Sequence, residues 1–321
     1  DIDSNTIDDD KRFTSSGDID LLIDLSPVTS EIHLNANSDG VGLEQINARY
    51  SFNSDFGVSF GRQLTSLGYE SDEAPELFAV TNGYFAEALV SQPGITSYLT
   101  EAVRQANLVI DAANINNGVG PGDPGYQEQL SNSDILPKLR RNYVDGIRLN
   151  YNNGMFGFIF GLHDEYGFDS LTGSGNDLDD GIAIDLAASV MFMPGLEARL
   201  GFVNDNGSSD DDVQQINGWL GWNPGDLTLA VEFDSFSLAN DTDAWNMMLL
   251  ANYQFSDFFG ATIRYAHMDH EADESDRLTL ALLFSITDNF GMNLEYSYTD
   301  GEKNGGDFDS NEFYLQALLS Y

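Results

Sequence analysis

The sequence predicts an all-β protein that folds as a transmembrane antiparallel up-and-down β-barrel. Three observations predict this fold class. Apolar and polar residues alternate over many separate segments, short and long connections between these segments also alternate, and the final segment ends on an aromatic residue, Tyr321. In a strand such alternation gives one apolar and one polar face, which suits a wall between lipid and a water-filled interior.

The alternating segments fill most of the second half of the chain. In the last of them Phe313, Leu315 and Leu319 share one face with Tyr321, whereas Gln316 lies on the other. The same pattern occurs in segments 182–192, 196–202, 227–233, 247–255, 259–265, 278–286 and 290–298. Their lengths approach the roughly 9 to 11 residues with which a tilted strand crosses a bilayer. We therefore expect each segment to be one strand with its apolar face toward lipid.

The connections between these segments predict their arrangement. Turn-forming residues mark short connections at 152–154, 193–195, 223–225, 256–257 and 287–289, which we expect on the periplasmic side. Longer acidic stretches, expected as outer loops, occupy 163–180, 204–212, 238–243, 268–276 and 299–309. Counting hairpins back from Tyr321 indicates about 15 strands, and the even number usual in bacterial barrels indicates about 16. The remaining strand is expected either within 78–90 or, as we favour, before Asp1.

One connection, residues 65–142, is far longer than the others, and loops of such length are usually functional. Apolar residues between Ile95 and Ala113 follow helical spacing with Ser97 as a candidate N-cap, so a helix is expected near 97–113. Two placements of this loop are open. It either caps the barrel mouth or folds inward and narrows the pore, since a wide barrel keeps an aqueous channel unless something fills it. Residues 1–321 are expected to form one barrel domain.

Composition excludes several classes of protein. The 321 residues carry a formal net charge of -40, with 53 Asp and Glu against 13 Lys and Arg. A nucleic-acid partner is therefore not expected, because binding phosphates requires clustered cations. No run approaches the about 18 apolar residues of a membrane helix. The 21 Phe and 14 Tyr argue against a disordered acidic chain.

Short motifs in the N-terminal half indicate a family. The stretch 60–70 reads Phe-Gly-Arg-Gln-Leu-Thr-Ser-Leu-Gly-Tyr-Glu, 81–85 reads Thr-Asn-Gly-Tyr-Phe, and 145–151 reads Asp-Gly-Ile-Arg-Leu-Asn-Tyr. This series resembles the OmpL-like group of β-barrel porins, in which a strand ending in Gly-Arg or Gly-Lys leads into a Gly-Tyr-Glu loop. The long insertion after Phe85 departs from that group. The resemblance implies passive diffusion of small solutes and no catalytic residues.

Strand parity predicts which charged residues line the pore. The basic candidates are Arg49, Arg148, Arg199 and Arg264, together with Arg62 near the outer rim, whose parity the motif leaves open. Acids outnumber bases on the wall, where the candidates are Asp18, Asp20, Asp24, Glu31, Asp185, Glu197, Glu232, Asp234 and Glu295. Those on the long loop are Glu70, Asp72, Glu73, Glu101 and Asp111. A basic wall opposite an acidic loop would create a field across the pore. The alternative is that each arginine pairs with a neighbouring carboxylate of the wall.

We therefore expect a porin of the Gram-negative outer membrane, a water-filled channel for small hydrophilic solutes and ions that prefers cations. Its expected partners are these solutes, membrane lipid and lipopolysaccharide. The sequence leaves open whether the protein assembles as a homotrimer. No cofactor is expected beyond loosely held Ca²⁺ or Mg²⁺ at the acidic stretches 176–181 and 204–212. Enzymatic activity is not expected. One alternative is an outer-membrane phospholipase or protease, for which His163 or His267 would have to serve. The other is a soluble acidic β-protein, either a β-sandwich or a β-helix.

Overall fold

The described part of the chain is almost entirely β-structure. The computed structural model of the protein describes residues 17–37, 40–64, 66–70, 77–81, 143–164, 182–205, 213–238, 242–270, 273–303 and 306–319. No helix among these residues is both long and apolar enough to cross a membrane. The helix predicted near 97–113 lies outside the described residues.

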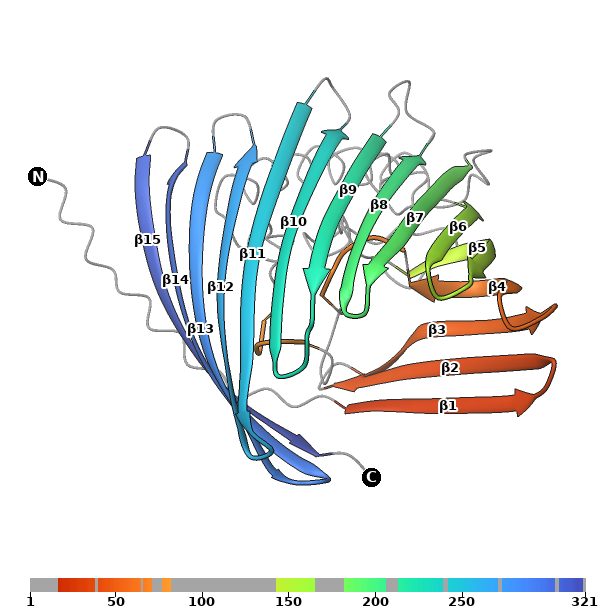
Figure 1. Cartoon of the computed structure of the whole chain (residues 1–321). Helices are drawn as coiled ribbons and strands as arrows, with labels where there is room; N and C mark the ends of the chain where they lie inside the picture. Colours follow the sequence, from red (N-terminus) through yellow and green to blue (C-terminus); the bar gives the residue numbers. More distant parts are fainter. Residues whose placement is uncertain are drawn as a thin grey trace, which may run out of the picture.

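In the described part of the chain, fifteen antiparallel strands form one sheet in which each strand pairs with its neighbours in the sequence. The strands are β1 (Gly17–Leu25), β2 (Val28–Asn37), β3 (Gly40–Ser51), β4 (Phe56–Leu64), β5 (Tyr143–Asn152), β6 (Phe156–His163), β7 (Ala183–Met193), β8 (Leu196–Asp205), β9 (Val213–Trp222), β10 (Leu227–Leu238), β11 (Thr242–Ser256), β12 (Phe259–His270), β13 (Asp273–Thr287), β14 (Phe290–Lys303) and β15 (Gly306–Leu319). The sheet curves strongly, and its hydrogen-bonded order ends at β1 and at β15 without closing (Figure 1).

This topology confirms the predicted antiparallel up-and-down barrel fold, in which about 15 strands were visible from the sequence. A sandwich of two sheets or a β-helix, the soluble alternatives, does not match a single meander of this length. Residues 77–81 are not part of a strand, and the rest of 78–90 lies outside the described residues. The sixteenth strand stays a prediction.

Short turns join the strands at one end of the sheet, as their residue types predicted. The turn between β7 and β8 shows why a glycine is needed there. Gly195 has a φ of 81°, and a Cβ at this position would lie 2.1 Å from the carbonyl oxygen of Asn223 in the next turn. A side chain would therefore strain the backbone and collide with the neighbouring turn.

The two faces of the sheet have opposite character. Large apolar side chains on the outward face are exposed, such as Leu280 at 46% and Leu294 at 42%. Their neighbours on the inner face are polar or small and buried, such as Thr279 and Ala281, each 1% exposed. A soluble protein would bury the first set, so this distribution is that of strands whose outer side contacts lipid.

Aromatic side chains gather on the outward face near the short turns. Phe255 and Phe259 stack with ring centroids 5.3 Å apart, and Phe259 lies at the same distance from Phe284. Phe52 and Phe56 form a similar stack at the turn between β3 and β4. Rings at this level are typical of the girdles that flank the apolar band of membrane barrels.

Candidate functional site

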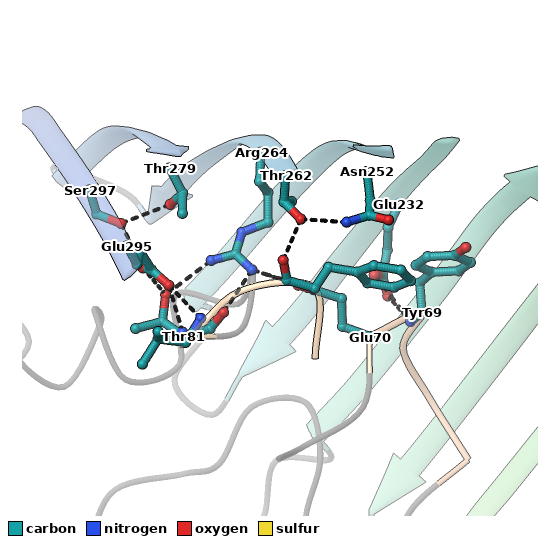
Figure 2. A network of polar contacts seen from close by, with 12 residues as sticks. Tyr69, Glu70, Thr81, Glu232, Asn252, Thr262, Arg264, Thr279, Glu295 and Ser297 are labelled. Atoms are coloured by element: carbon teal, nitrogen blue, oxygen red, sulfur yellow. Dashed lines mark hydrogen bonds and ion pairs between the residues drawn. The ribbon is translucent and has the colours of Figure 1, made fainter. Parts of the chain in front are cut away.

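Two short parts of the long connection after β4 lie against the inner face of the sheet. We call residues 66–70 and 77–81 the docked segments. Their contacts run from β5 to β14, and Figure 2 shows the part around β10 to β14. In this view Tyr69, Glu70 and Thr81 approach wall residues that come from distant parts of the sequence.

The first docked segment is held by polar residues of three strands. The Ser66 hydroxyl donates to Asp185 on β7 at 2.5 Å, and the Gly68 N–H donates to the side-chain oxygen of Asn217 on β9 at 3.2 Å. The Tyr69 N–H donates to both carboxylate oxygens of Glu232 on β10, each at 3.2 Å. These bonds satisfy backbone donors of a loop that has no strand partner.

The second docked segment is held in the same way by β12 and β14. The N–H groups of Val80 and Thr81 donate to Glu295 Oε2 at 2.7 and 2.8 Å, and the Thr81 hydroxyl donates to Glu295 Oε1 at 2.6 Å. The Thr262 hydroxyl donates to the carbonyl oxygen of Phe78. The Glu295 carboxylate of the wall thus accepts three hydrogen bonds from Val80 and Thr81.

Arg264 of β12 joins the two docked segments. Its Nη1 donates to both Glu70 oxygens at 3.0 and 3.1 Å and to the Thr81 carbonyl at 2.8 Å, while Nη2 donates to the Thr81 hydroxyl at 3.0 Å (Figure 2). The guanidinium is 1% exposed and the Glu70 carboxylate is fully buried. A planar guanidinium can make such a set of fixed bonds, whereas an ammonium group cannot.

Glycines of the wall form sockets for two apolar side chains of the first docked segment. A Cβ at Gly201 on β8 would lie 2.3 Å from Leu67 Cδ2, and a Cβ at Gly221 on β9 would lie 2.5 Å from Tyr69 Cε2. Leu67 is fully buried. It forms a small apolar cluster with three wall residues, Val144, Ala183 and Val203. The absence of side chains at two wall positions is therefore what lets the segment lie flat.

Aromatic side chains add to the packing between the docked segments and the wall. The Tyr69 ring stacks on Phe78 of the second docked segment, with centroids 6.1 Å apart, and meets Trp219 of β9 edge-on at 5.2 Å. These rings pack on three buried apolar residues of the inner face: Ala230, Met248 and Leu250. Burial, together with the nearby carboxylates, raises the pKa of Tyr69, so its phenol stays neutral.

Beneath the first docked segment lies a buried polar network. The Asn217 amide donates to Glu232 at 2.6 Å and to Asp234 at 2.8 Å, and the Gln215 amide donates to Asp234 at 3.0 Å. All four side chains are at most 2% exposed. Amide donors on β9 therefore compensate two carboxylates that lie two residues apart on β10.

Most of the predicted wall residues lie on the inner face but do not border open space. Arg148 pairs with Asp185 at 3.2 Å, and the two side chains are 10% and 0% exposed. Glu232, Asp234 and Glu295 are 1%, 0% and 3% exposed. The prediction that these groups face a water-filled path is corrected by their burial, because their oxygens serve the docked segments and the neighbouring strands. Arg264 is also buried, because its guanidinium bonds both docked segments.

Arg62 lies on the outward face, which corrects its prediction as a pore-lining residue. Ser59, which faces inward, pairs with Arg49 on β3 and with Arg148 on β5, so positions an odd number of residues from Ser59 face outward. Arg62 accordingly pairs across strands with exposed residues and forms a 3.1 Å ion pair with Asp145, which is 60% exposed. The sequence motif left this parity uncertain.

The remaining predicted residues lie in different environments. Arg49 is exposed on the inner face, and Arg199 and Glu197 are half-buried there. Glu101 and Asp111 lie outside the described residues, so the opposition of a basic wall and an acidic loop stays a prediction. The alternative, in which arginines pair with carboxylates of the wall, describes Arg148.

One inner-face cation was missed by the sequence analysis. Arg277 of β13 lies 2.8 Å from Glu312 of β15 through its Nη2, and both belong to the inner face by register. The signal was available, because Arg277 has the same parity as Thr279, and Leu278 and Leu280 had been placed toward lipid. The wall amides Gln215 and Asn217 had no such signal, since their role depends on the docked segment.

The candidate metal and catalytic residues are dispersed. The stretch 176–181 and most of 204–212 lie outside the described residues. Within the described residues no group of three or more His, Cys, Asp or Glu side chains is arranged to hold a metal ion. The His163 side chain is fully buried, 3.7 Å from Asp185, whereas His267 lies on the outward face 2.9 Å from Asp276.

Solved structures share this fold at low sequence identity. The outer membrane channel DcaP of Acinetobacter baumannii matches with a TM-score of 0.59 and 12% identity over 96% of this chain and 85% of its own. An anion-selective porin from Comamonas acidovorans matches with a TM-score of 0.55 and 14% identity over 96% and 85%. OmpF of Salmonella typhi, in complex with daunomycin, matches with a TM-score of 0.57 and 9% identity over 95% and 90%. No family model and no curated protein matches the chain. The fold is thus that of outer-membrane porin barrels.

Proposed function

We propose that the protein is an outer-membrane porin, a water-filled channel for the passive diffusion of small hydrophilic solutes and ions. The exposed apolar outward face supports a location in lipid, since strands such as β13 would not be stable in water with Leu278, Leu280 and Leu282 exposed. The fold shared with outer-membrane channels supports the same location. Membership of the OmpL-like group remains part of this proposal.

The observation that carries the channel function is the position of the docked segments. An antiparallel wall of this many strands encloses an aqueous interior unless other parts of the chain fill it. Residues 66–70 and 77–81 contact the inner face from β5 to β14, whereas Asp20, Asp24, Glu31 and Arg49 on the inner face of β1 to β3 are exposed. This arrangement supports a channel that is narrowed from one side.

Cation preference is the second part of the proposal. The sign of selectivity does not follow from the fold, since one protein with this fold is an anion-selective porin. It has to come from charges that ions can approach, and Asp20, Asp24 and Glu31 are exposed on the inner face of β1 and β2. The formal net charge of -40 adds a field that attracts cations to the mouth.

We further propose small hydrophilic solutes, membrane lipid and lipopolysaccharide as partners, and a homotrimer as the assembly. One solved structure of OmpT from Vibrio cholerae, similar with a TM-score of 0.52, is a trimer form. Catalysis is not part of the proposal, because His163 is buried and His267 faces outward. Lipase and protease assays on the folded protein test that point.

Single-channel recording tests the proposed function. Purified protein refolded in detergent and added to a planar bilayer should produce stepwise, ohmic conductance, and the reversal potential in a KCl gradient should show preference for K⁺. Boiled protein, which has lost the barrel, is the control and should produce no steps. Protein that folds and inserts but conducts nothing would overturn the channel proposal, and preference for Cl⁻ would overturn the cation preference alone.

A further inference from the structure

We propose that the ion selectivity of this channel is set on the inner face of β1 to β3 and is switched by protonation of His33. The inference rests on the proposed function and adds to it a selectivity site and a pH dependence. It starts from a contrast between two parts of the inner face, one covered by the docked segments and the other accessible.

The covered part holds charges that permeating ions cannot approach. Asp185, Glu232 and Asp234 are at most 1% exposed, and their oxygens accept hydrogen bonds from the docked segments or from wall amides. By contrast, the side chains of Asp20 on β1 and Glu31 on β2 are 51% and 48% exposed. Because dissolved salt screens charges beyond about 8 Å at physiological ionic strength, an ion meets mainly the charges of the accessible part, which are the carboxylates of Asp20, Asp24 and Glu31 and the guanidinium of Arg49 on β3.

His33 sits between these two accessible carboxylates. Its Nδ1 lies 2.9 Å from Asp20 Oδ1 on β1, the strand neighbour directly opposite in register, and its Nε2 lies 3.5 Å from Glu31 Oε2 on its own strand. The imidazole is 20% exposed, so it can exchange protons with the interior. A proton on this ring therefore changes the charge of an accessible cluster from two negative charges to one.

The third strand adds no cation directly opposite the ring. His33 pairs with Gln45 on β3, and a β-bulge at this point makes Glu44 an extra residue beside the pair. The titratable groups that surround the ring are thus Asp20 from β1, Glu31 from β2 and Glu44 from β3. All three are acids, and histidine is the side chain whose charge ordinarily changes near neutral pH.

The other histidines do not compete for this role in the described structure. The His163 side chain is fully buried at the end of β6, and His267 is on the outward face of β12. The side chain of His270 is outside the described residues. Histidine is the side chain whose charge ordinarily changes between about pH 5 and pH 8, so acidification in this window acts on the accessible inner face through His33.

The direction of the effect follows from charge. A neutral ring leaves Asp20 and Glu31 to attract cations, whereas a protonated ring cancels one of their charges. One charge a few ångströms from an ion in water changes the Boltzmann weight of that ion by roughly two- to fivefold. Because the change is opposite for K⁺ and Cl⁻, the ratio of K⁺ to Cl⁻ permeability should fall by at least this factor.

The experiment measures this permeability ratio at pH 8 and at pH 5.5 in planar bilayers. In His33→Gln the fall between the two pH values should disappear, while the ratio at pH 8 should match the original protein. His267→Gln is the matched control, since His267 also lies 2.9 Å from an aspartate but faces outward, and it should keep the full pH response. Asp20→Asn should lower the ratio already at pH 8.

The outcomes separate this inference from the proposed function. A pH response that persists in His33→Gln, or one that vanishes in His267→Gln, would overturn the assignment to His33. If His33→Gln does not fold, an unchanged ratio at pH 8 in Asp20→Asn would overturn the selectivity site by itself. Absence of any conductance in the original protein would instead overturn the channel function, on which this inference rests.

Discussion

Arg264 and Glu70 form a buried ion pair, with Nη1 3.0 Å from Oε1, between residues 194 positions apart in the sequence. One partner belongs to a wall strand and the other to the loop, so the pair fixes where the loop lies. Arg264 also bonds Thr81, and it therefore holds both docked segments at once.

Removing the carboxylate from this pair should release the loop. Glu70→Ala leaves the Arg264 guanidinium buried without its ionic partner, which typically costs about 3 to 5 kcal/mol. We expect a lower urea midpoint and a larger or noisier single-channel conductance. Arg62→Ala removes the exposed ion pair with Asp145 on the outward face, and it should change stability by at most about 1 kcal/mol and leave conductance unchanged. Equal effects of the two substitutions would contradict the conclusion that the Arg264–Glu70 ion pair holds the loop in place.

The glycines at positions 201 and 221 should be needed for docking of the loop, as the ion pair is. Gly221→Ala places a Cβ 2.5 Å from the Tyr69 ring, and Gly201→Ala places one 2.3 Å from Leu67. Each should displace the first docked segment and cost about 1 to 3 kcal/mol, the usual range for overpacking. Protease accessibility of the loop together with conductance would detect the displacement. Gly42→Ala is the control, because nothing lies within 4 Å of a Cβ there, and an equal effect at Gly42 would argue against the sockets.

The two faces of β14 should respond oppositely to an added charge. Leu294→Arg puts a cation on the outward face and should cost about 2 to 4 kcal/mol if that face lies at mid-bilayer. Asn293→Arg introduces the same side chain at the neighbouring position, which lies on the inner face, and it should be tolerated there. The shift in mobility between unboiled and boiled samples measures the folded fraction. Similar folded yields for the two variants would count against lipid contact at Leu294.

Like charges stand opposite each other on the outward face near the long loops. Asp300 of β14 pairs directly with Asp276 of β13 on one side and with Asp309 of β15 on the other. Because like charges in directly opposed positions destabilise a sheet, Asp300→Asn should raise stability by roughly 0.2 to 1 kcal/mol at low salt. The gain should shrink at about 1 M salt, where charges are screened within about 3 Å. A gain independent of salt would show that repulsion is not its cause.

The strands and their faces could be predicted from the sequence because both depend on local order. Alternate side chains of a strand point to opposite sides, so Leu280 and Thr279 could be assigned to different faces from parity alone. The turns were equally local, since Gly195 is needed by the backbone of one connection and by its nearest neighbour. Parity also places Arg277 on the inner face, although that residue was not identified from the sequence.

Which inner-face residues are accessible was decided only by the tertiary structure. Asp20 and Asp234 look alike in the sequence, as acids at inward positions of alternating strands, yet one is 51% exposed and the other is fully buried. The difference comes from a loop whose hydrogen bonds with the wall join residues 119 to 215 positions apart. Alternation determines the side of the wall on which a residue lies, because it is set by neighbouring residues. What covers that residue depends on long-range packing, which no local pattern records.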